Sequence, residues 1–185
     1  MANHTLVALV QDHPGVLHRT VTLLRRRGYN IVSLAVGRSE TAGISRMTIV
    51  VDVTDVSNVI KQLDRLVEII GVADITGAPA VVRETVMLKI MVPANAVPGA
   101  LQAAAEAATT AGGAILDRTE GELIVGATES PEQIERLITV MTPFGIAELM
   151  RTGRLAMLRG RTPQHLEPPT DYRAQADGAP FEEAA

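Results

Sequence analysis

Two polar residues, Asp12 and Asn30, flank the most informative stretch of the sequence, DHPGVLHRTVTLLRRRGYNI at 12–31. Asp12 is an acceptor that can pair with an ammonium group, and Asn30 can donate or accept hydrogen bonds. Pro14-Gly15 predicts a tight turn into a helix, whose first backbone N–H groups have no helical partner and can bind an anion. An anion site beside a cation site would suit a free α-amino acid.

The same turn predicts how the apolar part of such a ligand would be held. Gly15 lets a ligand approach the backbone closely, so that the N–H groups around it could reach a carboxylate. Val16, Leu17 and Ile31 would form aliphatic walls without a partner for a polar side chain, which favours an aliphatic amino acid. The predicted ligand-binding residues are Asp12, Gly15, Val16, Leu17, Asn30 and Ile31.

The elements that would position these residues follow from the hydrophobic pattern. Short apolar runs rich in β-branched residues predict strands, and apolar residues at helical spacing predict helices. Three arginines at 25–27 and then Gly28 end the first helix, where cations and glycine are favoured. The first half is predicted as βαββαβ, with strands at 5–10, 29–37, 44–53 and 69–76 and helices at 15–27 and 55–68.

The second half repeats this order of elements. Ser130-Pro131 followed by Gln133 is a capping box, so a helix begins there. The preceding helix would lie between Pro98-Gly99 and Gly112-Gly113. Strands are predicted at 86–92, 114–118 and 122–128, and the last strand or strands within 144–150 and 155–158.

An internal repeat supports this division. Pro14, Gly15, Gly28 and Ile31 recur 84 residues later, and Thr54, Ile60, Leu63 and Gly71 recur 74 residues later. One consistent offset in each part indicates two copies of one unit. We predict an α+β fold with two ferredoxin-like βαββαβ units, in which each antiparallel sheet carries its helices on one face.

The repeat also bears on an alternative role for the two polar residues. Asp12 could cap the first helix through an Asx turn, and Asn30 could satisfy a strand end. The second copy keeps the Pro-Gly turn but has Ala96 and Ala114 at the two equivalent positions. Because that turn manages without polar side chains, the comparison favours the binding role without removing the structural one.

Composition limits the class of protein. The 185 residues carry a net charge of −4 and 2% aromatic residues, which disfavours nucleic-acid and membrane binding. The absence of Cys excludes disulfides and Cys–Zn sites, and no signal peptide or transmembrane run is apparent, so we expect a cytoplasmic protein. Residues 161–185 contain prolines and acidic residues without periodicity, and a disordered tail is predicted.

The sequence contains no recognisable catalytic or metal-binding pattern. Walker, GxGxxG and HExxH motifs are missing, and no serine lies in a nucleophile elbow. His13 and His18 are expected to face solvent. We therefore predict no catalytic residue, no metal and no cofactor in this chain. A small enzyme on a ferredoxin-like scaffold stays open as an alternative, which turnover by the isolated protein would support.

Two pieces of the sequence resemble a known family: QDHPGVLHRTVTLLRRRGYNIVSLAVG and, following it, SRMTIVV. They are similar to the regulatory (small) subunit of acetolactate synthase, and the first unit looks like an ACT domain. The D-x-P-G-x-L turn is shared across ACT domains, whereas RRRGYNIVSL and SRMTI are specific to that subunit. The resemblance continues through RETVMLKIMV to about residue 160. It implies an effector-binding ACT domain at 4–78, a linker at 79–83 and a C-terminal ferredoxin-like domain at 84–160.

The resemblance implies a protein that is not an enzyme by itself. It would bind a larger catalytic subunit that uses thiamine diphosphate, Mg²⁺ and FAD to condense two 2-oxo acids. It would activate that subunit and confer feedback inhibition by valine, or by leucine or isoleucine, in branched-chain amino-acid biosynthesis. The effector would lie between the ACT domains of a homodimer, with Asp12, Gly15, Val16 and Leu17 from one protomer and Asn30 and Ile31 from the other.

The chain departs from the family at one of these positions. Many members carry Asn where this chain has Asp12, whose charge would hold the ammonium group but would also lie near the effector carboxylate. A different outcome also stays open, in which a freestanding ACT protein senses an amino acid and regulates another enzyme. Co-purification with a large thiamine-diphosphate enzyme would separate the two.

Overall fold

The computed structural model describes residues 2–93, 98–160, 163 and 166–168. The tail predicted at 161–185 lies outside the described residues, apart from 163 and 166–168. The described chain forms two compact units. Unit 1 contains the residues up to Val81 and those from Ala156 onward, and unit 2 contains Val82–Leu155.

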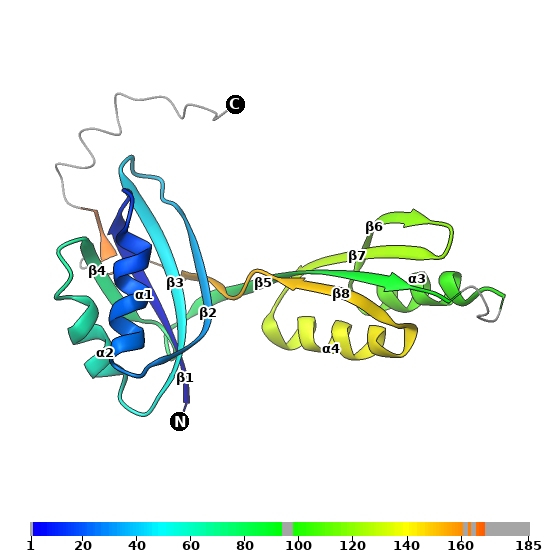
Figure 1. The fold of residues 1–185 in the computed structure, drawn as a ribbon, viewed down its shortest axis with the longest axis horizontal. Coiled ribbons are helices and arrows are strands. Elements are labelled where there is room, and N and C mark those ends of the chain that lie inside the picture. The colour runs from blue at the N-terminus through cyan, green and yellow to red at the C-terminus, as the bar shows by residue number, and fades with distance from the viewer. Residues whose placement is uncertain (1, 94–97, 161–162, 164–165, 169–185) are drawn as a thin grey trace. The chain divides into compact units, whose positions relative to one another are not determined.

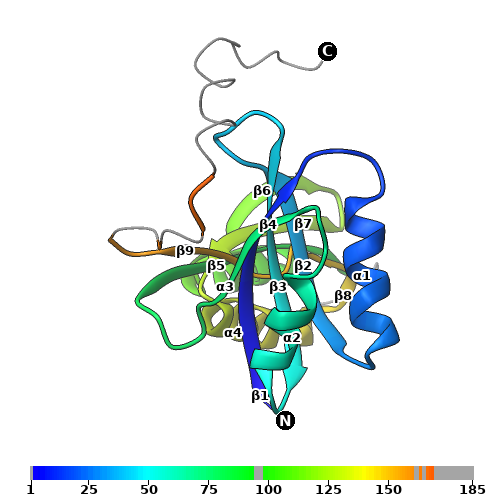
Figure 2. The ribbon, with the colours of Figure 1, turned by 90° about the vertical axis from the view of Figure 1, so that its left-hand side faces the viewer.

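Unit 1 has the predicted βαββαβ order. Its four strands form one sheet in the order β2-β3-β1-β4, and every neighbouring pair is antiparallel. Both helices lie on the same face of this sheet and alongside each other (Figures 1 and 2). The elements are β1 (Ala2–Gln11), α1 (Val16–Arg26), β2 (Asn30–Arg38), β3 (Ile44–Val53), α2 (Val56–Leu63) and β4 (Ile69–Asp74).

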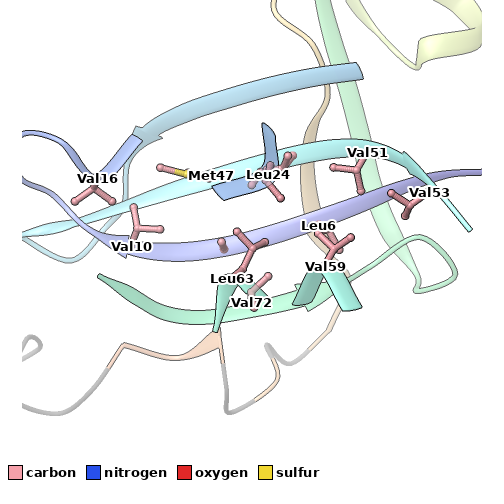
Figure 3. Close-up of a cluster of buried hydrophobic side chains, with 12 residues drawn as sticks. Leu6, Val10, Val16, Leu24, Met47, Val51, Val53, Val59, Leu63 and Val72 are labelled. Carbon is pink, nitrogen blue, oxygen red and sulfur yellow. The ribbon is translucent and has the colours of Figure 1, made fainter. Parts of the chain in front are cut away.

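The core of unit 1 is aliphatic, as expected for a chain with 2% aromatic residues. Alternate residues of a strand face the same side, so Leu6, Ala8 and Val10 of β1 point together toward the helices. Val16 and Leu24 of α1 complete this cluster, together with Val59 and Leu63 of α2 (Figure 3). Its buried members are Leu6, Ala8, Val10, Val16, Leu24, Met47, Ile49, Val51, Val53, Val59, Leu63 and Val72.

The central strand of unit 1 is buried on its second face too. Val7 and Leu9 point away from the helices, yet each is at most 3% exposed. Arg46, which lies opposite Leu9 in the register and shares its face, donates a hydrogen bond from Nη2 to the carbonyl of Ala156 at 2.9 Å. The chain that returns at Ala156 therefore packs on this face, which explains why β1 reads as a continuous apolar run.

Unit 2 repeats the architecture. Its strands are ordered β6-β7-β5-β8, β9 pairs with β5, and α3 and α4 cover one face of the sheet through a core rich in Ala, Leu and Val. The predicted capping box is confirmed, because Gln133 N–H donates to Ser130 Oγ. The elements are β5 (Ala80–Met91), α3 (Ala100–Thr110), β6 (Ala114–Thr119), β7 (Glu122–Glu129), α4 (Pro131–Met141), a 3₁₀ turn (Thr142–Phe144), β8 (Ile146–Arg151) and β9 (Leu155–Leu158). The first two residues of β5 and the last three of β9 belong to unit 1.

Two predicted element boundaries are wrong. The strand predicted at 86–92 begins at Ala80, so that most of the predicted linker 79–83 is strand, because β9 supplies a partner strand and the Arg159 N–H donates to the Pro79 carbonyl at 2.8 Å. The helix predicted at 55–68 ends at Leu63. Beyond it the chain continues in tight turns. Val67, which the helical pattern places on the apolar face of the predicted helix, is 87% exposed.

The internal repeat is confirmed in backbone detail. Gly15 and Gly99 precede their helices with φ of 92° and 87°, a left-handed conformation that side chains other than glycine rarely adopt. The first edge strand of each unit also skips one residue in its register, Val32 in β2 and Leu116 in β6. Such bulges bend a strand locally. The two units are therefore copies of one fold.

Candidate functional site

The turn between β1 and α1 carries the predicted acidic residue without using it as a helix cap. Gly15 occupies the N-cap position, and no side chain forms a cap hydrogen bond to α1. The Asp12 backbone N–H donates to the Gly43 carbonyl at 2.8 Å, which fixes the turn beside the loop after β2. The Asp12 carboxylate instead faces Arg38, with Nε 3.6 Å from Oδ2. The Asx-cap alternative for Asp12 is therefore wrong.

The backbone donors of this turn are available to a ligand. The N–H of Val16 reaches the His13 carbonyl only at 3.5 Å, a long hydrogen bond. The N–H groups of Gly15 and Leu17 form no hydrogen bond within the described part of the chain. His13 and His18 are exposed, as predicted. Gly15 has no side chain to cover these donors, so an anion could approach them from solvent.

The two aliphatic residues of the turn differ in what they can do. Leu17 is 45% exposed and can contact a ligand. Val16 is 3% exposed and packs in the core of unit 1 (Figure 3), where Val10 is a neighbouring member of the cluster. The prediction that the Val16 side chain lines the site is therefore wrong, and only its backbone can face a ligand.

Asn30 and Ile31 lie at the opposite end of the sheet from Asp12. In the register of β3, Gln11 is opposite Ile44, whereas Asn30 is opposite Asp52. The eight residues that separate these positions span about 26 Å along an extended strand. Because β1 and β2 both run antiparallel to β3, one chain cannot bring Asp12 and Asn30 together. A ligand that touches both must also touch a second copy of the chain.

Three charged residues beside the turn were not predicted as part of the site. Arg19 forms an ion pair with Glu68, with Nε 2.8 Å from Oε1. A Cβ atom on Gly15 would lie 3.6 Å from Arg19 Nη2, so this guanidinium stands next to the open side of the glycine. The sequence contained one signal for Arg19, because a residue four positions after Gly15 lies over it on a helix. Glu68 and Arg38 are distant in sequence, and only the fold brings them here.

These residues also balance the charge of the turn. Asp12 is paired with Arg38, and Arg19 is paired with Glu68. The carboxylate of Asp12, 40% exposed, therefore does not present an uncompensated negative charge to an incoming carboxylate. The turn therefore has an acidic group, Asp12, and a basic group, Arg19, near its backbone N–H donors.

Both units match family models. Residues 6–71 match the AHAS small subunit-like ACT domain, and residues 83–160 match the small subunit of acetolactate synthase. The probable acetolactate synthase small subunit of Archaeoglobus fulgidus is 40% identical over 159 residues, which cover 85% of this chain and 97% of that protein. The chain belongs to the acetolactate synthase small-subunit family.

Other small subunits agree with this assignment. That of Mycolicibacterium smegmatis is 38% identical over 85% of this chain and 91% of its own length. The crystal structure of the acetolactate synthase small subunit from Thermotoga maritima superposes with a TM-score of 0.76 at 31% identity, and covers 88% of this chain and all of that one. The ACT domain at the N-terminus is thereby confirmed, and allosteric regulation in branched-chain amino-acid biosynthesis fits this family.

The described residues contain neither a metal-binding cluster nor a membrane-spanning helix. Among the described residues, no group of three or more His, Asp and Glu side chains could hold a metal ion. Within the same part of the chain, no helix is long and apolar enough to cross a membrane.

Proposed function

We propose that this chain activates a catalytic acetolactate synthase subunit and makes it sensitive to feedback inhibition by a branched-chain amino acid. The observation that carries the proposal is the Pro-Gly turn of unit 1. It combines a carboxylate that no helix cap uses, N–H groups that have no partner among the described residues, and the exposed side chain of Leu17. These groups suit the ammonium, the carboxylate and the aliphatic part of one small amino acid.

A homodimer would complete this site. β2 is an edge strand of unit 1, and an edge strand has unpaired backbone groups that a second copy can pair with. If two β2 strands pair antiparallel about a two-fold axis near Leu34, the middle of the strand, then Asn30 of the partner subunit lies opposite Arg38. Arg38 is the residue paired with Asp12. This arrangement would remove the separation between Asp12 and Asn30 that exists within one chain.

The dimer also explains the aliphatic preference. Ile31 follows Asn30 and is half-buried against the core of unit 1. In the proposed dimer it would lie with Asn30 in the seam, which is the interface between the two β2 strands, and would face Leu17 of the partner subunit. No polar side chain among the proposed lining residues would serve a polar ligand side chain. Valine, leucine and isoleucine are therefore the candidates, and binding in a seam between two copies lets the ligand favour one dimer geometry.

The catalytic chemistry would belong to the partner. We expect the large subunit to carry thiamine diphosphate, Mg²⁺ and FAD and to condense two 2-oxo acids, with this chain acting beside it in the cytoplasm. Regulation would need a coupling free energy of about 1–3 kcal/mol between the effector site and the catalytic subunit.

Reconstitution tests the proposal. The large subunit from the same organism is purified alone, and the purified chain is then added to it. Acetolactate formation is measured with and without valine, leucine or isoleucine, with alanine and aspartate as controls. We expect activation by the chain and inhibition by a branched-chain amino acid only when the chain is present. Activation of the large subunit that no branched-chain amino acid reverses would overturn the sensor role, and absence of any interaction would favour a freestanding amino-acid sensor.

A further inference from the structure

The guanidinium of Arg19 lies beside Gly15, where the effector carboxylate would bind. Arg19 lies in the first turn of α1, and helical side chains point back toward the N-terminus of their helix. Its Nη2 and Cζ atoms are 3.6 Å and 3.9 Å from the position that a Cβ on Gly15 would take. The guanidinium therefore stands within contact distance of any group bound against Gly15.

Glu68 fixes this guanidinium by one nitrogen only. Nε of Arg19 is 2.8 Å from Oε1 of Glu68, a carboxylate that is 15% exposed. The backbone of Glu68 is itself tied to the end of β1, because its carbonyl accepts the Gln11 N–H at 2.9 Å. Within the described residues, neither Nη atom of Arg19 has a hydrogen-bond partner. Up to four N–H donors of a positioned cation are thus left over.

The second copy of the fold shows that the turn does not need this pair. Ala103 stands 84 residues after Arg19, and Thr142 stands 74 residues after Glu68. Gly99 has the same left-handed conformation as Gly15, yet no atom of the described residues lies within 4 Å of its Cβ position. The turn folds in unit 2 without a cation over the glycine, so the Arg19–Glu68 pair is not explained by the backbone conformation.

We infer that Arg19 is a specificity-determining residue that receives the carboxylate of the effector through its Nη atoms, while Glu68 holds Nε. This assignment rests on the proposed function. It adds the group that would recognise the free carboxylate of the amino acid. Arginine binds carboxylates through paired, charge-assisted N–H donors, which are stronger than hydrogen bonds between neutral groups. Arg38 is the less suitable cation, since it is 73% exposed and faces Asp12.

The test compares a ligand with and without its carboxylate charge. Calorimetry of the full-length chain measures binding of whichever of L-valine, L-leucine and L-isoleucine binds most tightly, and of its carboxamide, to the wild type and to Arg19→Gln. We expect Arg19→Gln to weaken binding of the amino acid by about tenfold or more and binding of the amide by less than about twofold. Arg25→Gln is the matched control, because Arg25 is an exposed arginine in the last turn of the same helix.

The outcomes separate this assignment from the proposed function. If Arg19→Gln weakens binding of the amino acid and binding of its amide equally, Arg19 has a structural role and the assignment is wrong. An effect of Arg25→Gln as large as that of Arg19→Gln would also overturn it, because net charge alone would then explain the loss. If the wild type binds none of the three amino acids, alone or with the catalytic subunit, the proposed function fails instead.

Discussion

Replacing Gly15 by Asp places a carboxylate where the effector carboxylate is proposed to bind. Gly15 has φ +92°, so any L side chain there is strained, at about 1–2 kcal/mol. The new Cβ would be 3.6 Å from Arg19 Nη2, an ordinary contact, so there is room for the side chain. The new carboxylate would pair with Arg19 and compete with Glu68 for it, and a partly exposed pair of this kind contributes about 0.2–1 kcal/mol.

The net loss of stability for Gly15→Asp should therefore be about 0–2 kcal/mol, which a folded domain tolerates. The effect on effector binding should be much larger, because the effector carboxylate would meet a fixed negative charge and would find Arg19 already paired with the new side chain. We expect activation of the catalytic subunit to be kept and feedback inhibition by valine to be lost. Acetolactate formation measured against valine concentration, with thermal unfolding of the chain alone, gives both quantities.

Gly99→Asp is the matched control for this variant. Gly99 has φ +87°, and in the described part of the chain nothing lies within 4 Å of its Cβ position, so it carries the same backbone strain without a described cation nearby. It should lose similar stability and keep valine inhibition. The reasoning is refuted if Gly15→Asp retains normal valine inhibition, or if Gly99→Asp loses it to the same extent.

Three further predictions concern single residues. Asn30→Ala should weaken valine binding by about tenfold or more in calorimetry with little change in Tm, because Asn30 is exposed in the isolated chain; a large drop in Tm would assign it a structural role. Ser130→Ala removes the confirmed cap of α4, and urea unfolding should show a loss of about 1 kcal/mol, whereas an unchanged midpoint would contradict the capping role. Gly113→Ala should cost about 1–3 kcal/mol in the same assay, because its Cβ would lie 2.7 Å from Val125 Cγ1 and 3.1 Å from the Ala108 carbonyl; a neutral substitution would show that this buried site relaxes.

Local patterns predicted most of the fold. The strand expected at 44–53 is β3 with the same limits, and the helix expected after Ser130 begins at Pro131 with both hydrogen bonds of its capping box. The alternation of apolar and polar residues, helical spacing and helix caps each depend on a few neighbouring residues, so they can be predicted without knowing the fold. The errors occur where a distant partner decides, as at Ala80, which is in strand because β9 pairs with β5.

The site was predicted in part for the same reason. Asp12, Gly15 and Leu17 are close in sequence and lie together at the turn, as expected. The long separation of Asn30 from Asp12 follows from the antiparallel partnership of both β1 and β2 with β3, which a single segment does not encode. The Arg19–Glu68 and Asp12–Arg38 pairs likewise join segments that only the fold brings together.

The most direct test asks whether the effector site is shared between two copies. Asp12→Ala and Asn30→Ala chains with different tags are co-expressed, and the heterodimer is purified through both tags. One of its two seams would then contain both substitutions, and the other would contain neither. The account predicts that each variant homodimer binds valine weakly, while the heterodimer binds it at wild-type affinity in about one site per dimer. A heterodimer that binds no better than the two homodimers would contradict a site built from Asp12 of one chain and Asn30 of the other.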